Sequence, residues 1–146
     1  MSSNTLTRPC ACNSVRKTAR VLARLFDAAL ADSGLNITQL AVMRAVLRHP
    51  HEPLSRVAED LAMDRTSLYR ALASLAKQHW ITLSDGADSR SRTAAVTRQG
   101  QAALARAEPG WHSTQHAVIE RFGAAQWQSL AAELQRLADC AGDVKT

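Results

Sequence analysis

Apolar residues along the chain recur at helical spacing in several separate segments. In the first segment, from about Ala11 to Ala31, the apolar positions step by three and four residues for about five turns. These positions are Cys12, Val15, Ala19, Leu22, Phe26 and Ala29. A seam of this length predicts a long helix that needs a packing partner, and a second copy of the chain can provide one. Gly34 is expected to end the helix.

A second helix is predicted from a cap signal at Asn36 or Thr38 to about Leu47. Its apolar residues are expected to pack beneath the module that follows. They are Leu40, Val42, Met43, Val46 and Leu47. Two prolines then exclude a continuous helix through Arg48–Pro53.

The segment Pro53–Gln78 has the pattern of two short helices joined by a tight turn. The apolar positions are spaced as two crossed helices require: Val57, Ala58, Leu61, Met63, Leu68 and Leu72. Asp64 occupies the N-cap position of the second helix. Ala62 lies in the turn, where a left-handed backbone would cost alanine about 1 kcal/mol, so we expect a turn that does not need glycine geometry. The exposed face of the second helix then carries side chains that can reach base edges and phosphates. They are Arg65, Thr66, Ser67, Tyr69 and Arg70.

Alternating apolar and polar positions predict two strands, Trp80–Ser84 and Arg92–Thr97, joined by a turn at Gly86–Arg90. A hairpin beside a recognition helix forms a wing, whose arginine can enter the adjacent minor groove. The wing residues with expected roles are Asp88, Arg90 and Arg92. Arg90 is assigned to the groove, and the carboxylate is expected to orient one of the two guanidinium groups through a charged hydrogen bond. The pattern as a whole is a winged helix-turn-helix, which places one helix in a DNA major groove.

Two more helices are predicted after the wing. Thr97 caps a long helix to about Phe122, in which Pro109-Gly110 predicts a kink or a break. Gly123 separates it from a final helix, about Ala124–Ala141. The expected stripe along the first helix is Leu104, Trp111, Gln115, Val118 and Phe122, and the residues expected on one side of the second are Trp127, Leu130, Leu134, Leu137 and Ala141.

The chain resembles the MarR (multiple antibiotic resistance regulator) family of bacterial transcription factors. The resemblance is carried by Met63-Asp64-Arg65-Thr66-Ser67-Leu68, by the wing motif Asp88-x-Arg90-x-Arg92 and by Val96-Thr97-x-x-Gly100, and it extends over nearly the whole chain. It implies a mainly α fold with a small β-wing, in one domain over residues 1–146. Residues 36–100 would form the winged helix-turn-helix DNA-binding module, and residues 1–34 and 101–146 the helices of an intertwined dimer.

The resemblance also implies a function. A homodimer would present two recognition helices to a pseudo-palindromic operator in double-stranded DNA, with half-sites about one DNA turn apart. Family members commonly act as repressors and lose DNA affinity when a small molecule, a metal or an oxidant acts on the dimer. The runner-up interpretation is a winged helix that docks a protein instead of DNA.

The cysteines are the first candidate for an effector site. Cys10 and Cys12 open the first helix, and Cys140 lies near the end of the last. If two copies interlock as the resemblance implies, the termini of the two subunits approach each other. The thiols then suit either oxidation to a disulfide or capture of a soft metal or metalloid. The alternative is that Cys12 is a buried seam residue and Cys10 merely an exposed thiol.

Two further groups remain open as effector sites. His112 and His116, four apart on one helix face, are a workable pair of zinc ligands, although two ligands are not a site and surface histidines are the commoner case. A pocket for an aromatic acid is the third candidate, against ordinary core packing. Its expected residues are Trp111, Gln115 and Phe26, with Arg16 or Arg20 to meet a carboxylate. No cofactor is expected beyond such an effector.

Composition supports the nucleic-acid partner. The 146 residues are 46% hydrophobic and 4% aromatic, which suits one mostly helical domain, and the net charge is +5. The strongest basic run precedes the first acidic residue: Arg8, Arg16, Lys17, Arg20 and Arg24. Arg16, Arg20 and Arg24 share a helix face, which either meets DNA phosphates or is simply solvated.

The sequence gives no sign of an enzyme or of membrane insertion. There is no glycine-rich phosphate loop, nucleophile elbow or paired-carboxylate arrangement, so we expect no catalytic activity. Neither a long apolar run nor a signal-peptide pattern is present, so we expect a cytoplasmic protein with no membrane partner.

Overall fold

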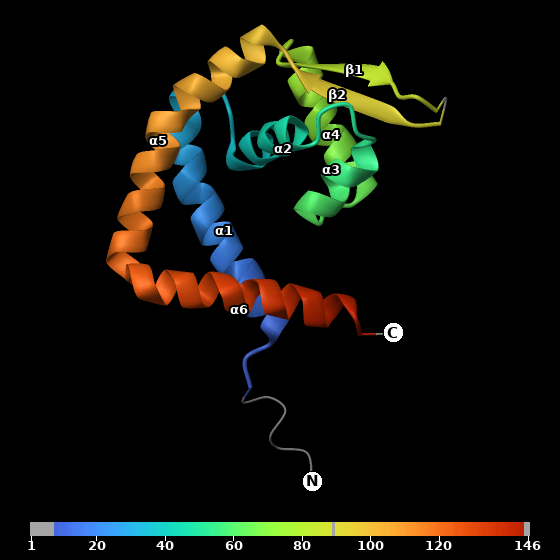
Figure 1. The fold of residues 1–146 in the computed structure, drawn as a ribbon. Helices are drawn as coiled ribbons and strands as arrows, with labels where there is room; N and C mark the ends of the chain where they lie inside the picture. The colour runs from blue at the N-terminus through green and yellow to red at the C-terminus, as the bar shows by residue number, and fades with distance from the viewer. Residues whose placement is uncertain (1–7, 89, 145–146) are drawn as a thin grey trace. The chain divides into compact units, whose positions relative to one another are not determined.

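The computed structural model describes residues 8–88 and 90–144, so Ser89 in the expected hairpin turn lies outside the described part. The elements in chain order are α1 (Ala11–Leu30), η1 (Ala31–Ser33), α2 (Ile37–Arg48), α3 (Leu54–Leu61), α4 (Arg65–Lys77), β1 (Ile81–Asp85), β2 (Arg92–Val96), α5 (Arg98–Phe122) and α6 (Ala124–Gly142) (Figure 1). The predicted helices and strands are confirmed, and so is the winged-helix fold. The chain divides into two compact units, Met1–Trp111 and His112–Thr146, and each is described by itself.

The core of the first unit lies among α2, α3, α4 and the two-stranded hairpin. Its largest fully buried side chains are Leu30, Leu40, Met43, Leu68, Leu72, Leu75, Val42 and Val57. The apolar faces predicted for α2, α3 and α4 are therefore confirmed. Leu47 is the exception in α2, because it is 48% exposed instead of packing beneath the module.

The helix boundaries follow from local hydrogen bonds. Gly34, which is predicted to end the first helix, has φ 78° and ends η1, the short 3-10 helix that follows α1. Asn36, rather than Thr38, caps α2: its Oδ1 accepts from the Gln39 backbone N–H at 2.8 Å, and its own N–H donates to Gln39 Oε1 at 3.0 Å. This reciprocal capping box satisfies two backbone donors that a helix start leaves without partners.

The wing is an antiparallel pair in which Ile81 is opposite Val96 and Asp85 is opposite Arg92. The predicted alternation is confirmed, since Ile81 is buried and Thr82 exposed. The base of the wing is joined to α5 by Thr97. Its hydroxyl donates to the His79 carbonyl at 2.6 Å and accepts from the Gly100 N–H at 3.0 Å.

Helix α5 differs from its prediction in two ways. It continues through Pro109, so of the predicted kink or break the break is wrong, and the kink stays a prediction. A proline removes one N–H donor, but the hydrogen bonds of the turns on either side remain. The buried residues of α5 are Gly100, Ala103 and Ala107, whereas Phe122 of the expected stripe is 51% exposed.

The second unit holds the C-terminal half of α5 and all of α6, separated at Gly123 with φ 107°. None of the described residues of α6 is buried. Its predicted stripe leaves Leu130, Leu134 and Leu137 between 38% and 43% exposed. Across the described residues, no helix combines the length and the apolar character needed to cross a bilayer.

Candidate nucleic-acid interface

The turn between α3 and α4 sets where the recognition helix begins. Ala62 has φ 49° and ψ 38°, a left-handed backbone, so the expected glycine-independent turn is wrong. The Ala62 N–H donates to the Glu59 carbonyl at 3.1 Å, and the Met63 N–H donates to the Ala58 carbonyl at 2.9 Å. These bonds satisfy carbonyls at the end of α3 and offset the cost, about 1 kcal/mol, of placing alanine there.

Asp64 caps α4 as predicted. Its Oδ1 accepts from the Ser67 backbone N–H at 2.8 Å, and its Oδ2 accepts from the Ser67 hydroxyl at 2.7 Å. The Ser67 hydroxyl, followed by the Ser67 backbone N–H, lowers the pKa of Asp64 below its ordinary value of 3.8. The hydroxyl proton of Ser67 is thus used within the protein, and Ser67 positions the start of α4.

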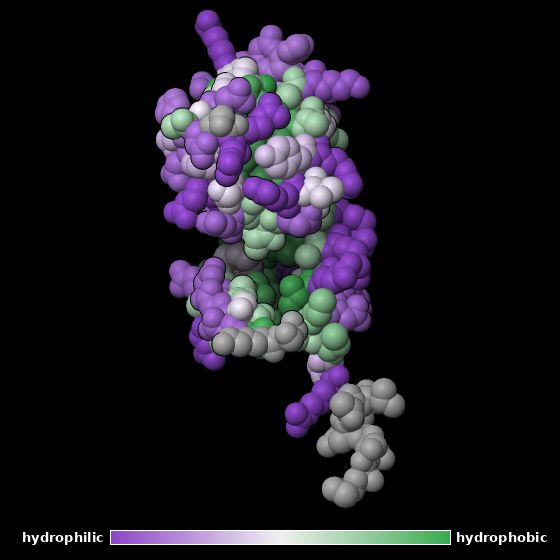
Figure 2. Space-filling model, turned by 90° about the vertical axis from the view of Figure 1, so that its right-hand side faces the viewer, coloured by the Kyte–Doolittle hydropathy of each residue, from purple (hydrophilic) through white to green (hydrophobic). Residues whose placement is uncertain are grey.

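The two faces of α4 are sharply different. Leu68, Leu72 and Leu75 are buried, which fixes the helix on the core. The other predicted contact residues of α4 are exposed: Arg65, Thr66, Tyr69 and Arg70. Figure 2 shows mainly hydrophilic side chains on the hairpin side of the first unit. The exposed face of α4 therefore presents hydrogen-bond donors to a partner outside the unit, as a recognition helix does.

The wing tip is organised by Asp88, but not as predicted. Asp88 Oδ1 accepts from the backbone N–H of Arg90 at 3.2 Å, and the Asp88 carbonyl accepts from the N–H and hydroxyl of Ser91 at 2.9 and 3.0 Å. The expected charged hydrogen bond to the guanidinium of Arg90 or Arg92 is therefore replaced by a bond to backbone. A short carboxylate reaches the amide two residues on more readily than a long, solvated arginine side chain. Both arginine side chains remain exposed.

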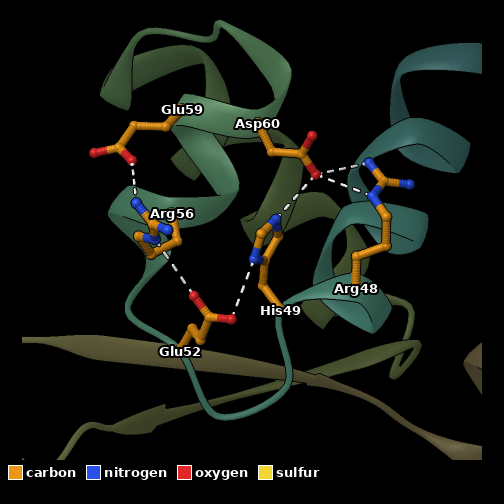
Figure 3. A network of polar contacts seen from close by, with 6 residues as sticks. All are labelled: Arg48, His49, Glu52, Arg56, Glu59 and Asp60. Atoms are coloured by element: carbon orange, nitrogen blue, oxygen red, sulfur yellow. Dashed lines mark hydrogen bonds and ion pairs between the residues drawn. The ribbon is translucent and has the colours of Figure 1, made fainter.

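Charged residues join the end of α2 to α3, a feature that the sequence interpretation missed (Figure 3). Arg48 donates through Nε and Nη2 to Asp60 Oδ2, at 3.0 and 2.8 Å. That hydrogen bond, with smaller contributions from His49, lowers the pKa of Asp60 although partial burial opposes the shift. Farther along, Arg56 pairs with Glu52 and Glu59. The spacing of Glu52, Arg56 and Glu59 is the sequence signal that predicts such pairs.

The candidate effector residues are distributed over both units. Cys10 is the N-cap residue of α1 and Cys12 lies in its first turn, whereas Cys140 is in α6, in the second unit. All three thiols are free and exposed, so Cys12 is not a buried seam residue in one chain. The predicted apolar seam of α1 is buried only toward the C-terminal end of the helix, at Phe26. Val15, near its start, is 41% exposed.

The two histidines of α5 line a cavity of about 400 Å³ in the second unit. His116 Nδ1 lies 3.7 Å from Glu120 Oε2, which also lines the cavity. Among residues 8–88 and 90–144, no three His, Cys, Asp or Glu side chains are grouped so that they could hold a metal ion. Zinc binding at His112 and His116 therefore stays a prediction that needs a ligand from elsewhere.

Trp111 lines a cavity of about 230 Å³ in the first unit, with different neighbours from those predicted. The other lining residues are Ile37, Leu40, Ala41, Arg44, Arg48 and Leu61. The Arg44 guanidinium lies 4.1 Å from the centroid of the Trp111 ring and pairs with Glu108 at 2.8 Å. Phe26 is buried and Gln115 lines the cavity of the second unit. The cations of the Trp111 cavity are thus Arg44 and Arg48 in place of Arg16 or Arg20.

Solved structures with the same fold are transcriptional regulators. The regulator MosR of M. tuberculosis in complex with DNA has 30% identity and a TM-score of 0.79, and covers 90% of this chain and 98% of its own. A second MosR structure has 27% identity and a TM-score of 0.82, with coverages of 92% and 97%. Sco3205, a MarR family regulator from Streptomyces coelicolor in complex with DNA, has 25% identity, a TM-score of 0.78 and coverages of 88% and 87%. No protein-family model and no curated protein matches the chain.

Proposed function

Because the chain belongs to the MarR family of transcriptional regulators, we propose that it binds a pseudo-palindromic DNA operator as a homodimer and acts there as a repressor. The recognition helix α4 of each copy enters a major groove, and the wing lies along the adjacent minor groove. The observation that carries this proposal is the division of α4 into a buried leucine face and an exposed face with two arginines and a tyrosine. MosR and Sco3205, which share the fold, are solved in complex with DNA.

Exposed apolar side chains on α1 and α6 support the homodimer. In α1 they are Val15, Val21 and Leu25, and in α6 they are Leu130, Leu134 and Leu137. Monomeric proteins rarely leave rows of large apolar residues in water, because each contributes stabilising free energy when buried. A second copy supplies matching rows by symmetry. Sedimentation or light scattering should give twice the mass of one chain.

The DNA contacts are tested by titrating a labelled duplex, selected from a random pool, at several salt concentrations. A DNA reader loses affinity steeply as salt rises, because bound cations are released from the phosphates. Arg90→Ala should weaken binding about equally for all sequences, whereas Arg65→Ala should also relax discrimination at one base pair by about 1–3 kcal/mol. Arg106→Ala, which removes an exposed arginine of α5, is the matched control. If all three variants changed the affinity for DNA equally, the protein-docking alternative would be favoured.

The thiols are the effector site that we favour. Cys10, Cys12 and Cys140 are all free and exposed, so an oxidant or a soft metal can reach them. Cys10 and Cys12 are two residues apart at the start of α1, and such positions do not face each other on a helix. A disulfide therefore forms between different segments or subunits. Joining those segments fixes the dimer in a spacing of recognition helices that misses successive grooves.

A small aromatic acid is the second candidate effector, favoured by the Trp111 cavity. Leu40, Leu61 and Trp111 offer apolar walls, and Arg44 and Arg48 offer cations for a carboxylate. Benzoate as a probe should raise the melting temperature of the wild-type protein and not that of Arg44→Gln. A similar rise in both proteins would exclude this cavity.

A further inference from the structure

A histidine between α2 and α3 has carboxylates at both of its ring nitrogens (Figure 3). His49 Nε2 lies 3.0 Å from Asp60 Oδ2, and Nδ1 lies 3.3 Å from Glu52 Oε1. A neutral imidazole has one N–H, so it donates to one carboxylate and turns a lone pair toward the other. An imidazolium donates to both carboxylates. The arrangement therefore fits the protonated ring better than the neutral ring.

His49 belongs to a wider network of charged side chains (Figure 3). The other members of this network come from the end of α2, from the loop that follows it and from α3: Arg48, Glu52, Arg56, Glu59 and Asp60. With a neutral ring, the three carboxylates outnumber the two guanidinium groups by one charge. A proton on His49 removes that excess. The side chains of His49 and Asp60 are 21% and 29% exposed, so water only partly screens the pair.

The contacts of His49 span the first helix of the helix-turn-helix. Glu52 lies just before α3, and Asp60 lies in its last turn, two residues before the left-handed Ala62. A bridge from Glu52 through His49 to Asp60 therefore holds both ends of α3 against the end of α2. Since the turn at Ala62 leads directly into α4, the position of α3 fixes where the recognition helix starts.

We propose that His49 is a proton-dependent positioning residue of the DNA-binding module: its imidazolium form bridges Glu52 and Asp60, holds α3 in place and increases affinity for DNA. Histidine side chains in general exchange a proton between about pH 5 and 8, so the proposal is tested by measuring DNA affinity on either side of that range. By linkage, a protein that binds DNA more tightly when protonated also takes up protons on binding DNA. The DNA part of this proposal rests on the proposed function, whereas the effect on folding does not.

The test compares wild type with His49→Gln, which keeps an amide donor but does not titrate. His51→Gln is the matched control, because His51 is an exposed histidine of the same loop. Urea unfolding is measured without DNA at about pH 5.5 and about pH 8.5, on either side of the histidine range. Affinity for the selected labelled duplex is measured at the same two values.

At the lower pH, we expect wild type to bind the duplex about three- to tenfold more tightly than His49→Gln, which is the size expected for a partly exposed charged hydrogen bond. At the higher pH, the two proteins should bind the duplex about equally. The urea midpoint of wild type should exceed that of His49→Gln at the lower pH only, and His51→Gln should follow wild type throughout. A ratio of affinities that is the same at both values would overturn the proposal. A pH-dependent difference in unfolding with no difference in DNA affinity would also overturn it, since His49 would then be only structural.

The two arms separate this proposal from the proposed function. If wild type binds no duplex at any salt concentration, the proposed function fails, and with it the DNA part of the role of His49. The unfolding arm still decides whether the Glu52–His49–Asp60 bridge depends on a proton. Equal unfolding differences at both pH values would overturn that dependence.

Discussion

Gly110 of α5 lies so close to Ala29 of α1 that a Cβ on the glycine would overlap with the Ala29 backbone carbonyl. The contact lets the two helix backbones approach without a side chain between them. Gly110→Ala should lower the free energy of unfolding by about 1–3 kcal/mol, because backbone atoms have to move to admit the methyl group. This loss exceeds the gain of about 1 kcal/mol that alanine brings to a helix. Urea unfolding measures the difference.

Gly142 provides the control for that substitution. It is the last residue of α6, and a Cβ there would meet nothing within 4 Å. Gly142→Ala should leave the free energy of unfolding unchanged or raise it slightly. If both alanine variants were equally stable, the close approach of α1 and α5 at Gly110 would be wrong.

The size of the buried residues explains where the fold could be predicted from the sequence and where it could not. Large apolar positions revealed the buried faces of α2, α3 and α4, because their spacing reports which side of a helix leaves water. In α5 the buried row consists of Gly100, Ala103 and Ala107. Close packing of helices selects small residues, which a search for large apolar side chains passes over. The predicted stripe therefore pointed to Phe122, which is exposed.

The candidate site was predictable only where its contacts are local in sequence. Asp64 and Ser67 are three residues apart, so the cap and the exposed face of α4 followed from spacing. The bridge from His49 to Asp60 joins the end of one helix to the last turn of the next. Its geometry depends on how the intervening loop, with a positive φ at His51, returns the chain, and residue spacing does not encode that path.

Ala62 is a site where a substitution should stabilise the protein. Its φ of 49° is left-handed, a conformation that glycine adopts without the clash of a Cβ. Ala62→Gly should raise the free energy of unfolding by up to about 1 kcal/mol and leave DNA affinity unchanged. Ala102→Gly, at an exposed position inside α5, should lower it by about 1 kcal/mol. Chemical denaturation that shows a loss for both variants would contradict the left-handed turn.

The cap of α4 should make stability sensitive to acid. The Ser67 hydroxyl and N–H hold the pKa of Asp64 below 3.8, and the Arg48 hydrogen bond does the same for Asp60. A carboxyl whose pKa is lower in the folded state stabilises it fully above the ordinary value, and this stabilisation is lost as pH falls through the folded pKa. Wild type should therefore lose melting temperature below about pH 4 more steeply than Asp64→Asn.

Ser67→Ala sharpens that experiment, because it removes the largest cause of the shift at Asp64 while the backbone N–H remains. Its melting temperature should fall less steeply with acid than that of wild type, and more steeply than that of Asp64→Asn. Three parallel acid profiles would show that the Asp64 cap has no part in the acid sensitivity.

The three cysteines give the prediction that decides between effector classes. Replacing Cys10, Cys12 and Cys140 together by serine removes every thiol and changes no charge on the recognition helix. In wild type, peroxide should oxidise two thiols to a disulfide, with two electrons and two protons passing to the peroxide to give water, and DNA should be released. Arsenite, which sulfur ligands capture without oxidation, should also release DNA if the sulfurs converge. The serine variant should keep its DNA under both treatments, as measured by anisotropy of a labelled duplex. Release of DNA from the variant at the wild-type concentration of peroxide would exclude thiol sensing and leave the Trp111 cavity as the effector site to test.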